Sequence, residues 1–207
     1  MYAIVENNNI IEYPIFNLQL RFPNISFPSH IDNNNLPLNV VKVIESSPPN
    51  YDFRVERISC RELPEFIDGN WVTVFDVHQL DTADVEHLKS QKRDELIAQV
   101  KNIRDMRVQT GGFQVSTKWY HSDTFSRTQQ LGLLSMGQSM PPGIMWKTMD
   151  GSFVEMTPTL ASQIFSAGAL SDLTIFGYAQ SLIETINNSS DPYSIDIHSG
   201  WPIIYGE

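Results

Sequence analysis

The run Gly112-Phe-Gln-Val-Ser-Thr-Lys-Trp-Tyr-His-Ser-Asp-Thr-Phe-Ser-Arg127 decides the fold of the second half of this 207-residue chain. Phe113 and Val115 alternate on one side of a predicted strand, and Trp119-Tyr120 supplies the bulky side chains of a return strand. The polar residues that follow have the side-chain oxygens with which helices commonly begin. The run therefore predicts a two-stranded ribbon that leads directly into a helix.

The helix after this ribbon is expected to run from about Asp123 to Met136 or Gly137. Either Ser122 or Asp123 can accept a hydrogen bond from its first free amide groups, and the sequence leaves that choice open. Gly137 and the Pro-Pro-Gly at residues 141–143 then stop the helix.

A second hairpin and a long helix are expected downstream. Residues 144–149 and 152–156 are predicted strands joined through Asp150-Gly151, a dipeptide that fits a type I′ turn. Thr157-Pro158 then provides a helix N-cap and first helical residue, and a broad apolar face continues to Asn187. Residues 191–207 show no clear period, so they are expected to form an extended arm on a neighbouring protein or a loose tail.

Upstream of the ribbon, residues 81–110 predict a long polar helix, because no Pro or Gly interrupts them and Asp81 or Thr82 can serve as its N-cap. Its thin apolar stripe means that it either bridges two domains through solvent or associates with copies of itself, and both alternatives stay open. The stripe that would carry self-association comprises Val85, Leu88, Leu96, Val100, Ile103 and Met106.

The first 80 residues predict a β-rich module. Two β-branched runs are joined by Asn7-Asn8-Asn9, which is a good hairpin signal because asparagine tolerates positive φ. Further strands are expected at residues 18–25, 38–44, 54–61 and 66–77, with a tight turn at Asp68-Gly69 and a Pro- and Asn-rich loop over residues 27–37.

The fold class is therefore α+β: an N-terminal β-rich docking module (1–80), a long connecting helix (81–110), a C-terminal domain of hairpins and helices (111–190) and a tail (191–207). The net charge of −10 argues against nucleic acid as a partner, because affinity for phosphate backbones comes from clustered Lys and Arg. No run of about 20 apolar residues or basic signal segment is present, so no membrane partner is expected. Cys60 is the single cysteine, which excludes an internal disulfide.

No catalytic constellation stands out. His121-Ser122-Asp123 contains the residue types of a catalytic triad, but adjacent residues cannot align as nucleophile, base and orienter. The histidines lack metal-ligand spacing, and the glycines lack the spacing and lysine of a phosphate loop. Neither catalytic activity nor a metal or cofactor is expected. Four aromatic residues are predicted to be core of the hairpin-helix units rather than a sugar-stacking platform: Trp119, Phe125, Trp146 and Phe153.

Two strings, Lys118-Trp-Tyr-His-Ser-Asp-Thr-Phe-Ser-Arg127 and Trp146-Lys-Thr-Met-Asp-Gly-Ser-Phe153, with Lys92-Arg-Asp-Glu-Leu96 before them, resemble DUF4376, an uncharacterised domain of tailed-phage and prophage proteins. The resemblance covers about residues 88–188, and the front half looks like the small β module found ahead of such domains. Residues 191–207 depart from the family pattern. The motif residues, to which the resemblance gives a structural role, are Trp119, His121, Ser122, Asp123, Phe125, Arg127, Trp146, Asp150, Gly151 and Phe153.

The resemblance implies a structural component of a tailed-phage virion, associated with the tail fibre or baseplate and located in the tail after assembly in the host cytoplasm. Its expected partners are other tail, baseplate or fibre proteins and copies of itself, with a trimer as one form. One alternative is a tail-fibre assembly chaperone that is absent from the finished particle. A polysaccharide-degrading enzyme would need paired carboxylates across a cleft, whereas Glu155, Asp172, Glu184 and Asp191 are predicted to lie on solvated faces.

Overall fold

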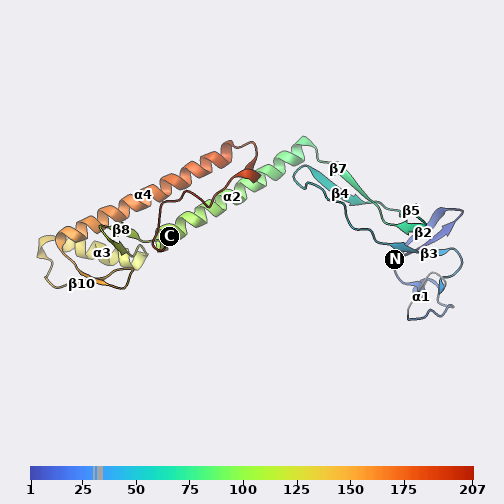
Figure 1. Ribbon diagram of the computed structural model, residues 1–207, viewed down its shortest axis with the longest axis horizontal. Coiled ribbons are helices and arrows are strands. Elements are labelled where there is room, and N and C mark those ends of the chain that lie inside the picture. Colours follow the sequence, from blue (N-terminus) through green and yellow to red (C-terminus); the bar gives the residue numbers. More distant parts are fainter. Residues whose placement is uncertain (30, 32–34) are drawn as a thin grey trace. The chain divides into compact units, whose positions relative to one another are not determined.

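The computed structural model describes residues 1–29, 31 and 35–207, so the loop predicted over residues 27–37 lies partly outside the described residues. The fold is α+β, as predicted, with a β-rich N-terminal region and a long helix. The chain forms two compact units, Met1–Glu86 and His87–Glu207 (Figure 1). The boundary between them falls inside the helix α2 (Thr82–Thr110).

The first unit contains a five-stranded sheet in the order β2-β1-β3-β6-β5. Its strands are β1 (Tyr2–Glu6), β2 (Asn9–Ile15), β3 (Val40–Ile44), β5 (Glu65–Ile67) and β6 (Asn70–Val72). The predicted hairpin between β1 and β2 is confirmed, with Asn7 and Asn8 at φ 51° and 61°. Both values are positive, as a two-residue type I′ turn requires.

The strand predicted at residues 18–25 is wrong, because the chain forms a single helical turn there, α1 (Leu18–Arg21). The side chain of Asn17 accepts a hydrogen bond from the amide of Leu20 at 3.1 Å, which stabilises the start of a helix. Leu18 is buried in the core of this unit, whereas Leu20 is exposed. The Asn17 cap therefore decides the local structure.

The segment predicted as one strand after Asp68-Gly69 is divided into two. It enters the sheet as β6, then leaves it and continues as β7 (Phe75–Gln79), which pairs with β4 (Glu56–Cys60) in a separate ribbon. The break lies at the buried Thr73, whose amide donates to Ile44 O at 3.0 Å and whose hydroxyl accepts from the amide of Ser46 at 2.9 Å. These bonds hold the chain where the strand changes sheet.

The second unit follows the predicted order of elements. After α2 come β8 (Phe113–Val115), β9 (Lys118–Tyr120), α3 (Thr124–Met136), β10 (Met145–Lys147), β11 (Phe153–Glu155) and α4 (Pro158–Asn188), with short 3-10 turns at Gly137–Ser139 and Pro192–Ser194. Of the two caps considered for α2, Asp81 is the one used, because its side chain accepts from the amide of Asp84. The predicted cap at Thr157 is confirmed, because its side chain accepts from the amide of Leu160. Local polar signals therefore predicted where the helices begin.

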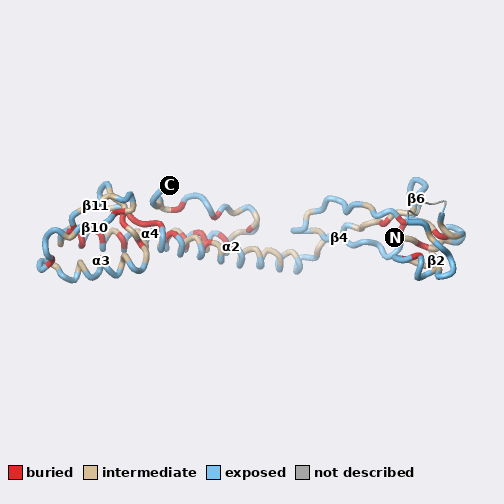
Figure 2. The backbone as a smooth tube through the Cα atoms, turned by 90° about the horizontal axis from the view of Figure 1, so that it is seen from below, coloured by how far each residue is buried: buried red, intermediate tan, exposed pale blue. Residues whose placement is uncertain are grey.

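One core of the second unit joins α2, α4 and the C-terminal segment. Leu96 and Val100 of α2 are buried against a row of α4 side chains, with Ile103 packed beside them. Figure 2 shows buried stretches of the backbone, in red, in the region of α2 and α4. The α4 row and its neighbours in the C-terminal segment are Ile175, Ala179, Leu182, Ile186, Ile197 and Trp201. Leu96 and Val100 are therefore not open to the self-association considered for this helix, because the chain itself covers them. For Val85, Leu88, Met106 and the partly buried Ile103 it stays a prediction.

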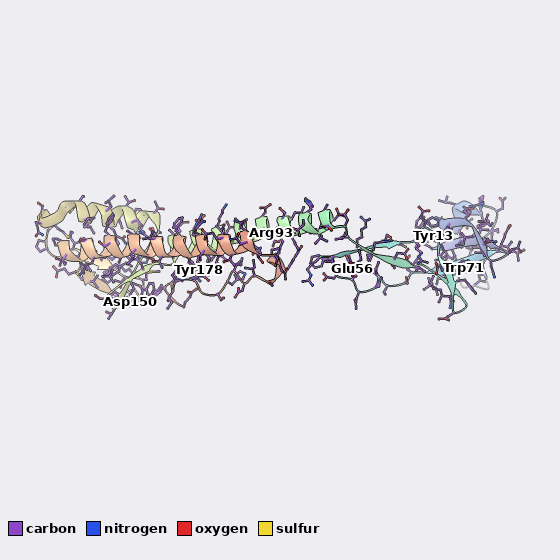
Figure 3. All side chains as sticks on the ribbon, turned by 90° about the horizontal axis from the view of Figure 1, so that it is seen from above. Tyr13, Glu56, Trp71, Arg93, Asp150 and Tyr178 are labelled. Carbon is purple, nitrogen blue, oxygen red and sulfur yellow. The ribbon has the colours of Figure 1, made fainter. Side chains whose placement is uncertain are left out.

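The C-terminal segment is neither a loose tail nor an arm on a neighbour, which corrects that expectation. The indole of Trp201 is 7% exposed and donates to Ile197 O at 2.8 Å. Arg107 of α2 donates to Pro202 O at 2.9 Å and forms an ion pair of 2.6 Å with Glu207. The hydroxyl of Tyr178, labelled in Figure 3, donates to Ser199 O at 2.7 Å. These bonds fasten residues 191–207 to α2 and α4.

A second core holds the hairpins against α4. Its buried members come from the β8–β9 hairpin, from the segments on either side of the β10–β11 hairpin and from the first turns of α4, and they are Phe113, Tyr120, Met140, Met156, Ala161 and Ile164. Gly168 of α4 permits this packing, because a Cβ there would lie 3.2 Å from Phe113 and 2.7 Å from the guanidinium of Arg127. The two family-like strings thus meet around one end of α4.

Candidate functional site

The two strings that resemble the family are joined by direct hydrogen bonds. Lys118 Nζ lies 2.8 Å from Asp150 Oδ2 and 2.7 Å from Ser152 Oγ. The amide of Met149 donates to Trp119 O at 2.9 Å. These bonds hold the strand β9 against the loop between β10 and β11.

The loop itself differs from the predicted type I′ turn. Gly151 has φ 82°, but Asp150 is not among the residues with positive φ, which a type I′ turn would require. Instead the amide of Gly151 donates to Thr148 O at 3.0 Å and the amide of Thr148 donates to Ser152 O at 2.9 Å, which closes a three-residue loop. Asp150 Oδ1 accepts from the amide of Ser152 and from the buried hydroxyl of Thr148, and these bonds favour the longer loop.

The ammonium of Lys118, together with hydrogen bonds from Thr148 and Ser152, holds the pKa of the Asp150 carboxyl well below its ordinary value. A carboxyl whose pKa is lower in the folded than in the unfolded protein stabilises the fold when both states are ionised. That contribution is present above the unfolded pKa of about 3.9 and is lost as the pH falls toward the folded pKa. The hairpin is therefore expected to weaken in acid.

Asp150→Asn tests this pH dependence. We expect the difference in unfolding free energy between wild type and variant to be constant above about pH 5 and to shrink below about pH 4. Urea unfolding followed by circular dichroism across this range measures it. Glu184→Gln is the control, since among the described residues its carboxylate bonds only the neutral amide of Gln180. If the difference in unfolding free energy between wild type and Asp150→Asn did not vary with pH, Asp150 would not have a lowered pKa in the folded protein.

The cap of α3 settles the choice between Ser122 and Asp123. Asp123 Oδ1 accepts from the amide of Ser126 at 2.9 Å, so Asp123 is the cap. The backbone amide of Ser126, and then its hydroxyl, also lower the pKa of Asp123. Ser122 is buried, and its hydroxyl accepts from the amide of Gly112 at 2.9 Å. Ser122 and Asp123 thus have separate structural partners.

Arg127 connects the start of α3 to α4. Its guanidinium donates to Ser122 O at 3.2 Å and to Asp172 Oδ1 at 2.7 Å, and it lies over the ring of Phe113, 5.0 Å from the centroid. Gln130, also on α3, is buried and donates to His121 O at 2.9 Å. The family-like string therefore orients α3 against the rest of the domain.

This orientation opens a groove of about 590 Å³ between α3 and the segment around β10. Phe125 and Met145 stand on its two sides with 72% and 55% of their surface exposed. It is lined by His121, Phe125, Ser126, Gln129, Gly132, Leu133, Met136, Ile144, Met145, Trp146 and Lys147. Phe125 and Phe153, predicted as core, are in fact exposed, so that prediction is wrong for both.

The groove offers apolar contact and little else. Its two titratable side chains are His121 and Lys147, and no carboxylate lines it. Lys147 is exposed and takes part in no ion pair within the described part of the chain. Trp146 Nε1 is buried without an acceptor among the described residues. A site of this kind fits an apolar segment of another protein that carries an acidic side chain beside its anchor.

Several residues of this groove were not predicted from the sequence as site residues. Gln129, Gly132 and Met136 recur with Phe125 at helical spacing, so they share a face of α3, and this spacing could have indicated them. Met145 could not be predicted in this way, because a three-residue strand is too short for its sequence to show which face is covered. Trp119 of the motif instead lies half-buried beside Tyr205, with ring centroids 6.0 Å apart.

In residues 1–29, 31 and 35–207, no three or more His, Cys, Asp or Glu side chains gather where they could hold a metal ion. None of the helices described combines the length and the apolar character needed to cross a bilayer.

A family model described as a domain of unknown function, DUF4376, matches residues 91–199. The match begins within α2, includes both hairpins, α3 and α4, and continues to Ser199. The expectation that residues 191–207 depart from the family pattern is therefore wrong for residues 191–199. Neither the curated proteins nor the solved structures contain a match to the chain.

Proposed function

The chain belongs to the DUF4376 family, and from that premise we propose that it is a structural component of a tailed-phage virion that attaches proteins of the tail fibre or baseplate. The family description assigns no activity. The phage setting of the proposal rests on the resemblance of the strings at residues 118–127 and 146–153 to a domain of tailed-phage and prophage proteins. In this proposal the protein is not an enzyme and acts by binding other tail, baseplate or fibre proteins and copies of itself.

The observation that carries the proposal is the apolar groove between α3 and β10. Exposed aromatic and Met side chains that converge on one groove are typical of surfaces where proteins bind one another. The groove is built on a rigid frame, because the Asp123 cap and the Arg127–Asp172 pair fix α3. A preformed groove loses little conformational entropy on binding, which favours a stable attachment.

The charges support a protein partner over a nucleic acid. The chain has 24 acidic and 14 basic residues, so an extended phosphate backbone would be repelled by most of its surface. Lys147 is a single ammonium at the rim of an apolar groove, which suits one carboxylate of a partner. The proposed location is accordingly the virion tail, after synthesis and assembly in the host cytoplasm.

Quantitative mass spectrometry of gradient-purified particles tests the proposal. We expect the chain to be present in fixed ratio to the tail proteins. Phe125→Ser should reduce its incorporation by about tenfold or more, since removing an aromatic anchor commonly costs 2 kcal/mol or more of binding energy. Leu131→Ser is the matched control, because Leu131 is also an exposed apolar residue of α3 but does not line the groove.

Each outcome decides a different part of the proposal. Depletion of the wild-type chain from particles, with retention in the cell lysate, would replace the virion component by a tail-fibre assembly chaperone. If Phe125→Ser and wild type were incorporated into particles in equal amounts, the groove would not be the surface through which the chain attaches. Release of reducing sugar from host capsule by the purified chain would replace both with an enzyme.

A further inference from the structure

The helix α4 leaves one apolar face uncovered. Phe165, Leu173 and Phe176 are 47%, 69% and 46% exposed, and Ala169 between them is exposed as well. At about 100° per residue these four positions fall within a stripe about 80° wide. The stripe lies beside, and not within, the row of α4 residues that forms the core with α2. About half or more of the surface of Phe165, Leu173 and Phe176 therefore stays open to solvent in the described chain.

The stripe is also almost free of charge. Over Pro158–Ile183 the single charged side chain is Asp172, and its carboxylate is bonded to Arg127. The surface of a monomeric domain usually carries charged residues at about a quarter or more of its positions. From neighbouring elements, Arg104 of α2 lies over the ring of Phe176, 4.7 Å from the centroid, and is paired with Asp105. The charged side chains of Asp172 and Arg104 are thus both paired within the chain, so neither one opposes a second apolar surface at this stripe.

We propose that this stripe binds the same stripe of a second copy of the chain, with the two α4 helices antiparallel about a two-fold axis near Ser171. In that arrangement Leu173 of each copy lies opposite Ala169 of the other, so a large side chain meets a small one twice. Phe165 of each copy then lies close to Phe176 of the other. The four side chains of one copy thus fit the same four side chains of an antiparallel copy, as a two-fold interface requires.

Charge favours a second copy over a charged partner, and the exposed area of the stripe is sufficient for a specific interface. The acidic excess of the chain is concentrated outside this helix, since residues 1–86 hold 13 acidic and 5 basic residues and residues 87–207 hold 11 and 9. A charged partner would find no complement on the stripe, whereas an identical uncharged surface meets no repulsion.

The stripe offers on the order of 400 Å² of exposed apolar surface, and a specific interface buries about 800 Å² per partner, of which somewhat more than half is apolar. Exposed Ser162, Ser166 and Gln180 along the same side supply a neutral polar rim.

Sedimentation velocity of the full chain tests the proposal. We expect a reversible monomer–dimer equilibrium in the micromolar range, and Leu173→Gln should weaken it by about a hundredfold or more, because a two-fold interface loses the contact twice. Leu170→Gln is the matched control, since Leu170 is 64% exposed on the same helix but about 100° from the centre of the stripe. The dimer dissociation constant of Leu170→Gln should stay within about threefold of the wild-type value.

Disulfide trapping tests the antiparallel arrangement. Ala169→Cys and Leu173→Cys chains, both with Cys60→Ser, should form the mixed disulfide in preference to either symmetric one when they are combined and oxidised. A wild-type chain that stays monomeric at concentrations on the order of 100 µM, a trimer, or equal weakening by Leu173→Gln and Leu170→Gln would each overturn the two-fold interface. Preferential symmetric disulfides would overturn its antiparallel order.

Discussion

Replacing Trp201 with alanine is expected to lower the free energy of unfolding of the second unit by about 3–5 kcal/mol, the range typical of removing a buried aromatic ring. Trp201 is 7% exposed and belongs to the core that joins α2, α4 and the C-terminal segment. Its ring lies 5.1 Å from that of Tyr178 in an edge-on arrangement and 5.5 Å from the guanidinium of Arg107. The substitution removes all of these contacts and leaves a cavity.

The effect should exceed that of an ordinary core substitution, because Trp201 fixes a segment that has little secondary structure of its own. Only a short 3-10 turn occurs after α4, so the segment is held by side chains such as Ile197 and by the Arg107–Glu207 pair. Loss of the indole also leaves Ile197 O without its donor. An unsatisfied buried carbonyl adds to the cost of the cavity.

Urea unfolding followed by circular dichroism measures the change, with Ile203→Ala as the control. Ile203 lies two residues away in the same segment but is 73% exposed, so its replacement should change stability by less than about 0.5 kcal/mol. A Trp201→Ala protein within about 1 kcal/mol of wild type would mean that the segment does not pack on α2 and α4 as described.

The elements of this chain were predictable wherever one short stretch contains both the apolar period and its end signals. Asn7-Asn8, Asp123 and Thr157-Pro158 each specify a turn or a helix start through bonds to the next few residues. The prediction failed at Leu18, because a four-residue turn is too short to show a helical period. Side-chain bonds within a loop also decided against the expected turn at Asp150-Gly151.

Which surfaces the chain covers by itself could not be predicted. Leu96, Val100 and Ile103 have the same helical spacing whether they face another copy or α4, so the period cannot distinguish these partners. The partner turned out to include Ile197 and Trp201, about a hundred residues downstream in a segment without regular period. The groove depends in the same way on α3 meeting β10, a contact between elements that neither one specifies alone.

Replacing Gly112 with alanine is expected to destabilise the second unit by about 2–4 kcal/mol, because backbone strain and overpacking act together. Gly112 is buried at φ +68°, where an L-residue is strained. Its new Cβ would overlap Met149 Sδ and lie 2.9 Å from Tyr120 O. The thioether can move aside, but the carbonyl belongs to β9 and cannot shift without disturbing the ribbon.

The same Gly-to-Ala replacement at Gly177 is expected to raise the stability of the fold. Gly177 lies in α4 at a helical φ, and a Cβ there would meet nothing within 4 Å. Alanine is favoured over glycine in a helix by about 0.5–1 kcal/mol, so this variant should be more stable than wild type. Thermal and urea unfolding of both variants at low concentration separates the two effects.

The test depends on the sign of the difference in unfolding free energy between Gly112→Ala and Gly177→Ala. Gly112 joins the end of α2 to the ribbon, and its amide donates to the buried hydroxyl of Ser122. Strain at Gly112 therefore acts on the Ser122–Asp123 corner that begins α3 and so on the wall of the groove. If Gly112→Ala were as stable as Gly177→Ala, the backbone at Gly112 would not lie as close to Met149 and Tyr120 as described. The position of α3, which forms one wall of the proposed binding groove, would then also be wrong.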